Sequence, residues 1–116
     1  MIGFEAFAEM VETRCINTWR SVIGIEDADI IEKINTVVFS KRNDGDDWTF
    51  SFGLRMGDEW YQSSQTIEPV EYDILNPPPI DDAEACMNPQ HKASTLAMSL
   101  INANVTRVRY ACKQRY

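Results

Sequence analysis

Apolar residues recur every three or four positions over the first 22 residues, which is the spacing of one face of a helix. Most charged residues of this segment lie off that apolar stripe, and Gly24 follows as a residue suited to a helix end. The pattern therefore predicts an amphipathic helix from Phe4 to Val22. The stripe consists of Phe4, Phe7, Ala8, Val11, Cys15, Trp19 and Val22.

A second, shorter helix is predicted from Asp27 to Asn35, because an aspartate suited to an N-cap precedes a group of isoleucines. The following segment, Thr36 to Lys41, is apolar and rich in β-branched residues, which favours a strand. Asn43-Asp44-Gly45-Asp46 then supplies the residues of a tight turn.

The strict alternation of apolar and polar residues from Trp48 to Met56 predicts a strand with one buried face. Gly57-Asp58 marks a second turn, and Glu59 to Ile67 returns as a third strand. A further strand is predicted at Val70 to Ile74, where Pro69 places it at an edge or a bend. The middle of the chain is thus expected to form an antiparallel meander.

Three prolines at 77–79 predict a stiff extended connector. Asn88 and Pro89 suit the cap and first turn of a helix, and apolar spacing continues that helix over 89–102. Asn102 and Asn104 are weak helix formers, so we expect the helix to end near them.

The last segment, 105–116, fits two patterns. Its β-branched and aromatic residues favour a closing strand, with the arginines on one side. As a helix, it would continue the apolar stripe Ala97, Ile101, Val105, Val108 and Cys112. We expect the strand and keep the helix as the alternative. The predicted fold class is α+β.

Size and composition predict one globular domain over 1–116, with 44% hydrophobic and 25% charged residues among 116. No apolar run approaches the roughly 20 residues of a transmembrane helix, and the first ten residues lack the basic start of a secretory signal. Three widely spaced cysteines suggest reduced thiols in a cytoplasmic protein. We therefore expect a soluble protein of the cytoplasm.

The formal net charge of −7 argues against direct binding to nucleic acid or to a membrane surface, because both are anionic. The charge is also unevenly distributed. The first 84 residues hold all eighteen acids and six bases, a formal charge of −12, whereas the last 32 hold five bases and no acid. Either the basic tail packs against the acidic body, or it forms an anion-binding surface.

Catalytic motifs are absent from the sequence, which contains no GxGxxG, no GxxxxGK[ST], no GxSxG and no HExxH. One histidine and three scattered cysteines give no metal-ligand spacing, and Cys86 with His91 form only a remote candidate for a nucleophile and base. We therefore expect a non-enzymatic protein that needs neither a metal nor another cofactor.

The leading prediction is an interaction protein, of the inhibitor or adaptor type, that acts through surface contacts on a larger partner. Carboxylates on the two predicted turns would form an acidic face complementary to a basic surface of that partner. These candidate partner-binding residues are Asp44, Asp46, Asp47, Asp58 and Glu59.

The alternative prediction is a protein that binds or sequesters an anionic, nucleotide-like small molecule. A helix N-terminus favours anions, and two arginines on one side of a strand would bind phosphate. The candidate ligand-binding residues are Asn88, His91, Lys92, Arg107 and Arg109. An exposed closing strand would also allow a homodimer through pairing with its copy, and the sequence does not decide the oligomeric state.

Overall fold

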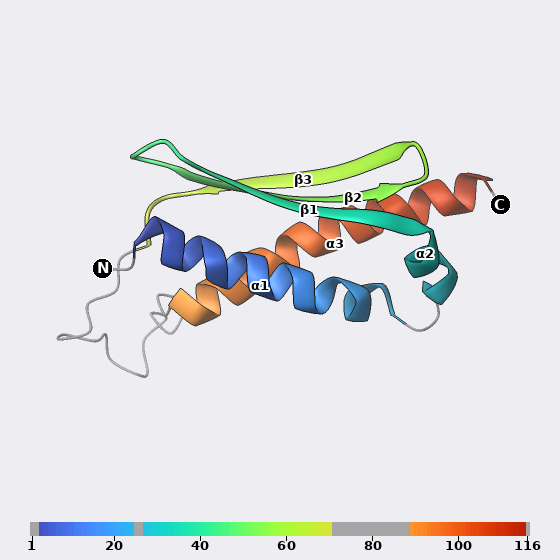
Figure 1. Cartoon of the computed structure of the whole chain (residues 1–116), viewed down its shortest axis with the longest axis horizontal. Helices are drawn as coiled ribbons and strands as arrows, with labels where there is room; N and C mark the ends of the chain where they lie inside the picture. Colours follow the sequence, from blue (N-terminus) through green and yellow to red (C-terminus); the bar gives the residue numbers. More distant parts are fainter. Residues whose placement is uncertain (1–2, 25–26, 71–88, 116) are drawn as a thin grey trace.

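The computed structural model describes residues 3–24, 27–70 and 89–115, which form one sheet and three helices (Figure 1). In chain order the elements are α1 (Phe4–Ile23), α2 (Ala28–Lys33), β1 (Ile34–Asn43), β2 (Trp48–Met56), β3 (Glu59–Ile67) and α3 (Pro89–Arg115). The predicted α+β class is confirmed, with an N-terminal helix, three antiparallel strands and a C-terminal helix.

The strands pair in the order β1-β2-β3, so each hairpin joins neighbours in the sequence (Figure 1). Helices α1 and α3 lie side by side against one face of this sheet and run in the same direction. The middle of α1 contacts the start of α3, where Arg14 Nη2 donates to Gln90 Oε1 at 2.7 Å. Among the described residues, no helix covers the other face of the sheet.

Helix α1 confirms the predicted amphipathic pattern and ends one residue later than expected. Its stripe, including Phe7, Val11 and Cys15, is fully buried against the sheet and α3. Gly24 adopts φ 87°, a left-handed value that favours glycine, and its N–H donates to the carbonyl of Arg20 at 3.1 Å. The predicted helix stop is therefore confirmed.

The predicted alternation in β2 is confirmed, because its helix-facing residues are all buried. Phe4 and Phe7 of α1 contact the rings of Trp48 and Phe50, with centroids 5.4 to 5.8 Å apart. Aromatic contacts of this kind add to the burial of apolar area, so they fix the start of α1 on the first half of β2. The buried face of β2 consists of Trp48, Phe50, Phe52, Leu54 and Met56.

The predicted closing strand at 105–116 is wrong, because helix α3 continues without interruption from Pro89 to Arg115. Val105 and Val108 are buried, 2% and 1% exposed, on the continuous helical stripe. Burial of two valines outweighs their modest helix propensity. Asn104 does not weaken the helix, because its Nδ2 donates to the carbonyl oxygen of Phe52 in the central strand at 2.5 Å.

Smaller differences concern the other elements. The second helix is shorter than expected, because residues 34 and 35 already belong to β1. No fourth strand is seen among the described residues, and Val70 is buried outside the sheet while 71–74 lie outside the described range. The proline connector at 77–79 also lies outside it. Of the helices described, none has the length and apolar character needed to traverse a lipid bilayer.

Candidate functional site

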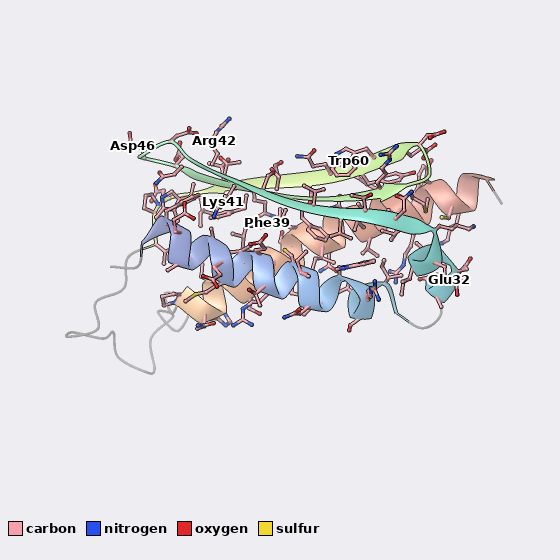
Figure 2. The ribbon with its side chains drawn as sticks, in the orientation of Figure 1. Glu32, Phe39, Lys41, Arg42, Asp46 and Trp60 are labelled. Atoms are coloured by element: carbon pink, nitrogen blue, oxygen red, sulfur yellow. The ribbon has the colours of Figure 1, made fainter. Side chains whose placement is uncertain are left out.

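The β1–β2 turn presents three of the five predicted partner-binding carboxylates. The Asp44 N–H donates to the Asp47 carbonyl at 2.9 Å, and Gly45 allows the turn with φ 88°. The Asn43 side chain accepts the Gly45 N–H at 2.9 Å. Arg42 Nε lies 2.9 Å from Asp44 Oδ2, so this aspartate is partly neutralised. These contacts stabilise the turn, with Asp46 at its tip (Figure 2).

Asp46 and Asp47 share a surface hollow of about 650 Å³ with residues from two other segments. Glu68 adds a third carboxylate just after β3, and Lys92 reaches the same hollow from the first turns of α3. Neither Asp46 nor Asp47 forms an ion pair within the described part of the chain. The hollow therefore combines members of the two predicted residue sets and has an excess of negative charge.

Further carboxylates lie at the same end of the molecule, on the first turns of α1. Lys41 Nζ of β1 lies 2.5 Å from Glu5 Oε2, and this hydrogen bond is the main cause that raises the Lys41 pKa above its ordinary value. The charges of Glu5, Glu12 and Glu9 raise this pKa further. We name Glu5, Asp44, Asp46, Asp47 and Glu68 the acidic end.

Asp58 and Glu59 do not belong to the acidic end. They lie at the β2–β3 turn, and the nine residues of β2 separate the two turns by about 30 Å. Figure 1 shows the two turns at opposite ends of the sheet. The carboxylate of Glu59 accepts a hydrogen bond from Tyr61 Oη. The five predicted residues therefore do not form one surface.

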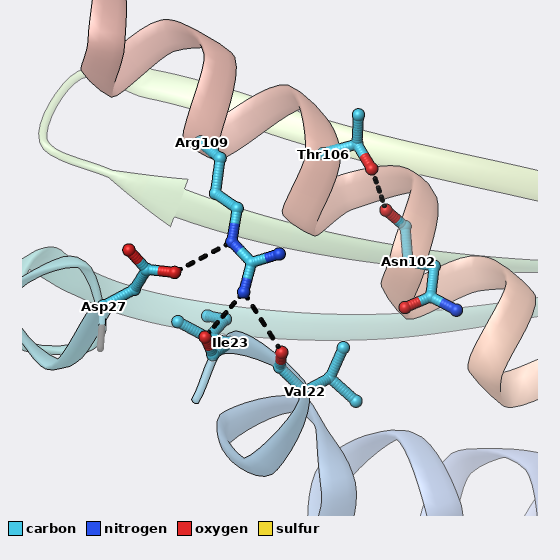
Figure 3. Close-up of polar contacts among 6 residues, drawn as sticks. All are labelled: Val22, Ile23, Asp27, Asn102, Thr106 and Arg109. Atoms are coloured by element: carbon cyan, nitrogen blue, oxygen red, sulfur yellow. Dashed lines mark hydrogen bonds and ion pairs between the residues drawn. The ribbon is translucent and has the colours of Figure 1, made fainter. Parts of the chain in front are cut away.

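Arg109 holds the end of α1 in place rather than facing solvent as a free cation. Its Nη2 donates to the carbonyl oxygens of Ile23 at 2.7 Å and Val22 at 3.4 Å, and its Nε pairs with Asp27 at 2.9 Å (Figure 3). The last carbonyls of a helix lack internal partners, so Arg109 acts as a cap for α1.

Arg107 points to a different part of the molecule. Its Nη1 donates to the carbonyl oxygen of Gln62 on β3. Two residues apart on a helix, the side chains of Arg107 and Arg109 diverge by about 200° around the axis, whereas on a strand they would share a side. The prediction that both arginines bind one anion assumed a closing strand. Because this segment is a helix, the two side chains point in different directions and do not share a site.

His91 and Lys92 line a groove of about 380 Å³ between the start of α3 and β3. Asn88, the predicted helix cap, lies outside the described residues. Gln65 Nε2 donates to Ser99 Oγ across this groove. Its lining combines two apolar residues with several polar ones: Gln65, Ile67, His91, Lys92, Thr95, Leu96 and Ser99.

The cysteines give no reactive centre among the residues the structure describes. Burial, followed by the charge of Glu12, raises the pKa of the Cys15 thiol to about 12, so this thiol stays protonated. Cys112 is half-buried, and Cys86, the predicted partner of His91, lies outside the described residues. No cluster of three metal-ligating side chains is found in the described ranges.

The uncovered face of the sheet is a feature that the sequence reasoning did not single out. Side chains on it form hydroxyl pairs, Thr49 with Thr66 at 2.9 Å and Ser51 with Ser64 at 2.6 Å. Trp60 is 45% exposed on this face (Figure 2). The alternation in β2 assigns Thr49 and Ser51 to this face, but only the strand register pairs them with β3.

Comparison with known proteins identifies no relative, since no protein family, no curated protein and no solved structure matches this chain.

Proposed function

We propose that the protein is a non-enzymatic interaction module of the inhibitor or adaptor type, whose acidic end binds a basic surface on a larger partner. The observation that carries this proposal is the convergence of the β1–β2 turn, Glu68 and the start of α1 at one end of the molecule. Three separate segments contribute carboxylates there, and the backbone of the turn is fixed by its own hydrogen bonds.

A rigid group of like charges supports an interaction role for two physical reasons. It steers a partner of opposite charge during encounter, and it disfavours partners of the same charge. Asp46 and Asp47 contribute most, because neither forms an ion pair in the described ranges, whereas Glu5 and Asp44 are paired. Binding through such a surface weakens as the salt concentration rises.

Site-specific photo-crosslinking tests the proposal. A photoreactive residue placed at Asp46 should crosslink a protein with a basic surface, and the same residue at Asp58 serves as the matched control at the opposite turn. With that partner in hand, the double change Asp46→Lys and Asp47→Lys should weaken binding by about tenfold or more, and Asp58→Lys should have little effect. Equal crosslinking from both turns would overturn the assignment to the acidic end.

A second candidate function rests on the groove beside His91 and Lys92. A small anionic molecule, such as a nucleotide, would meet Lys92 and the polar side chains of Gln65, Thr95 and Ser99 there. A ligand present at about 100 times its Kd stabilises the folded state by roughly 2.7 kcal/mol. Thermal unfolding with a panel of nucleotides should then show a shift that Lys92→Ala abolishes and that Lys113→Ala retains.

A further inference from the structure

Helix α1 has, besides its buried apolar stripe, an exposed stripe of mostly charged residues. Residues 5, 9, 12, 16 and 20 follow one another at steps of three or four, so they occupy one side of the helix. All five are exposed, and Ile16 keeps 44% of its surface accessible. Along the helix the stripe changes from acidic through apolar to basic, in the order Glu5, Glu9, Glu12, Ile16, Arg20.

This stripe borders strand β1. Lys41 of β1 pairs with Glu5, and the charges of Glu12 and Glu9 also act on it. Helix α1 and strand β1 run in opposite directions on the same side of the molecule (Figure 1). The stripe and the outer edge of β1 are therefore parts of one continuous surface.

The outer edge of β1 has unpaired backbone groups. In an antiparallel ladder, successive residues direct their N–H and C=O groups alternately toward the partner strand and away from it. The Asp44-to-Asp47 hydrogen bond fixes this alternation, so the backbone groups of Val37, Phe39 and Lys41 point away from β2. Within the described part of the chain, no hydrogen bond from another element reaches them, whereas at β3 Arg107 covers the carbonyl of Gln62.

Two exposed apolar residues, one on α1 and one on β1, lie at the same level along these two elements. Lys41 pairs with Glu5 and also feels the charges of Glu9 and Glu12, so it lies along the segment from Glu5 to Glu12. From Glu9, in the middle of that segment, Ile16 lies seven residues further along α1, or about 10 Å. The same distance corresponds to about three residues of β1 in the opposite direction, which reaches Val38. Val38 is 42% exposed on β1 and belongs to the uncovered face of the sheet.

The charged residues on either side of Ile16 are placed so that two copies related by a two-fold axis would bring opposite charges together. A rotation about an axis near Ile16 brings each residue of the stripe opposite the one equally far on its other side. Glu12 and Arg20 are each four residues from Ile16, so Glu12 of one copy faces Arg20 of the other, twice. The Arg20 guanidinium also stacks on Trp19, 5.2 Å from the ring centroid, which holds it at the surface.

We propose that a second copy of this chain binds to the surface formed by the α1 stripe and the β1 edge, related by a two-fold axis near Ile16 and Val38. Glu12 and Arg20 form reciprocal ion pairs across it, and the β1 edges lie antiparallel so that their outward N–H and C=O groups meet. A second copy is the occupant because the stripe is complementary to itself, with Glu12 and Arg20 at equal distances on either side of the exposed Ile16. This surface goes beyond the acidic end of the proposed function, and Asp46 and Asp47 take no part in it.

Sedimentation velocity of the full chain over a range of concentrations tests the proposal. The unmodified protein should form a dimer, and Glu12→Arg or Arg20→Glu alone should each weaken it by about tenfold or more. The double variant with both changes should restore the dimer, because the reciprocal pairs are re-formed with exchanged signs. Met98→Lys, which adds a charge at a 38% exposed residue of α3, is the control and should leave the dimer intact.

Hydrogen exchange distinguishes the two parts of the surface. The amides of Val37, Phe39 and Lys41 should exchange more slowly as the concentration rises, while Met98→Lys leaves this behaviour unchanged. A monomer at all concentrations overturns the proposal, and so does a dimer that tolerates both single charge reversals. A dimer with charge rescue but without protection of these amides confines the contact to the helices and overturns the strand pairing. Circular dichroism of each variant shows that the fold is retained.

Discussion

The indole ring of Trp60 lies directly over Gly53, so that a Cβ atom at position 53 would come within 2.3 Å of its Cζ2 atom. Gly53 sits in the middle of the central strand and faces Gln62, with Trp60 as its diagonal neighbour. Glycine weakens a strand, and the ring compensates by covering the exposed backbone. The pair therefore explains both a glycine in the best-patterned strand and an exposed tryptophan.

Gly53→Ala should displace the Trp60 ring from the sheet. The methyl group occupies the position of the ring, and we expect a cost of about 1 kcal/mol or more, partly offset by the better strand propensity of alanine. Trp19 and Trp48 are buried, so acrylamide quenching of tryptophan fluorescence reports mainly on Trp60 and should increase. Ser51→Ala on the same face is the control. Unchanged quenching in Gly53→Ala would contradict the contact.

Asn104→Asp should strongly destabilise the fold. Asn104 is fully buried in α3, its Nδ2 donates to the Phe52 carbonyl, and its Oδ1 has no partner among the described residues. A carboxylate there would repel the carbonyl and lack a counter-charge, which costs about 3 kcal/mol or more. Denaturant unfolding at neutral pH measures the loss, and Asn102→Asp, exposed two residues earlier, should cost little. A small loss at position 104 would mean that water reaches this site.

Arg109→Ala should destabilise the protein by about 1 kcal/mol, because the carbonyls that end α1 lose their donor and Asp27 loses its partner. Arg109→Lys should recover only part of this, since an ammonium cannot reproduce the fork of hydrogen bonds. Thermal unfolding measures both, with Lys113→Ala as an exposed control on the same helix. An Arg109→Ala variant of normal stability that loses ligand response would instead assign this arginine to an anion site.

Cys15 should resist thiol reagents until the protein unfolds. Burial raises its pKa from 9.0 to about 12, so the folded state favours the protonated thiol. The resulting stabilisation is complete below about pH 9, where the thiol is protonated in both states, and is lost as the pH rises toward 12. Labelling with a disulfide reagent at pH 8 tests this in a variant with Cys86→Ser and Cys112→Ser. A variant that keeps only half-buried Cys112 should react without denaturant, and equal rates would refute the burial of Cys15.

The sequence predicted the helices and strands correctly wherever the spacing of apolar residues matched the side of the element that is buried. The stripe of α1 and the alternation of β2 are of this kind, because each buries one side of a single element. The end of α3 could not be decided locally, since Val105 and Val108 suit a strand by propensity and a helix by spacing. Their contact with a core formed by distant residues settled the choice.

The candidate site was less predictable than the fold. The sequence identifies acidic residues on two turns. Whether these residues form one surface depends on whether the turns lie at the same end of the sheet, and Asp47 and Asp58 lie at opposite ends. Glu68 and Lys92 joined the acidic hollow only through the three-dimensional arrangement. The role of Arg109 required knowing that α3 passes the end of α1, which no periodicity reveals.

The pairing of α1 with α3 has a consequence for how the chain matures. The meander joins neighbours in sequence and forms early, whereas Ile23 and Arg109 meet although they are 86 positions apart in the sequence. Until the last helix has been synthesised, the aromatic face of β2 and the stripe of α1 remain without their final cover. We expect the nascent chain to depend on chaperones during this interval and to become protease-resistant only once α3 has docked.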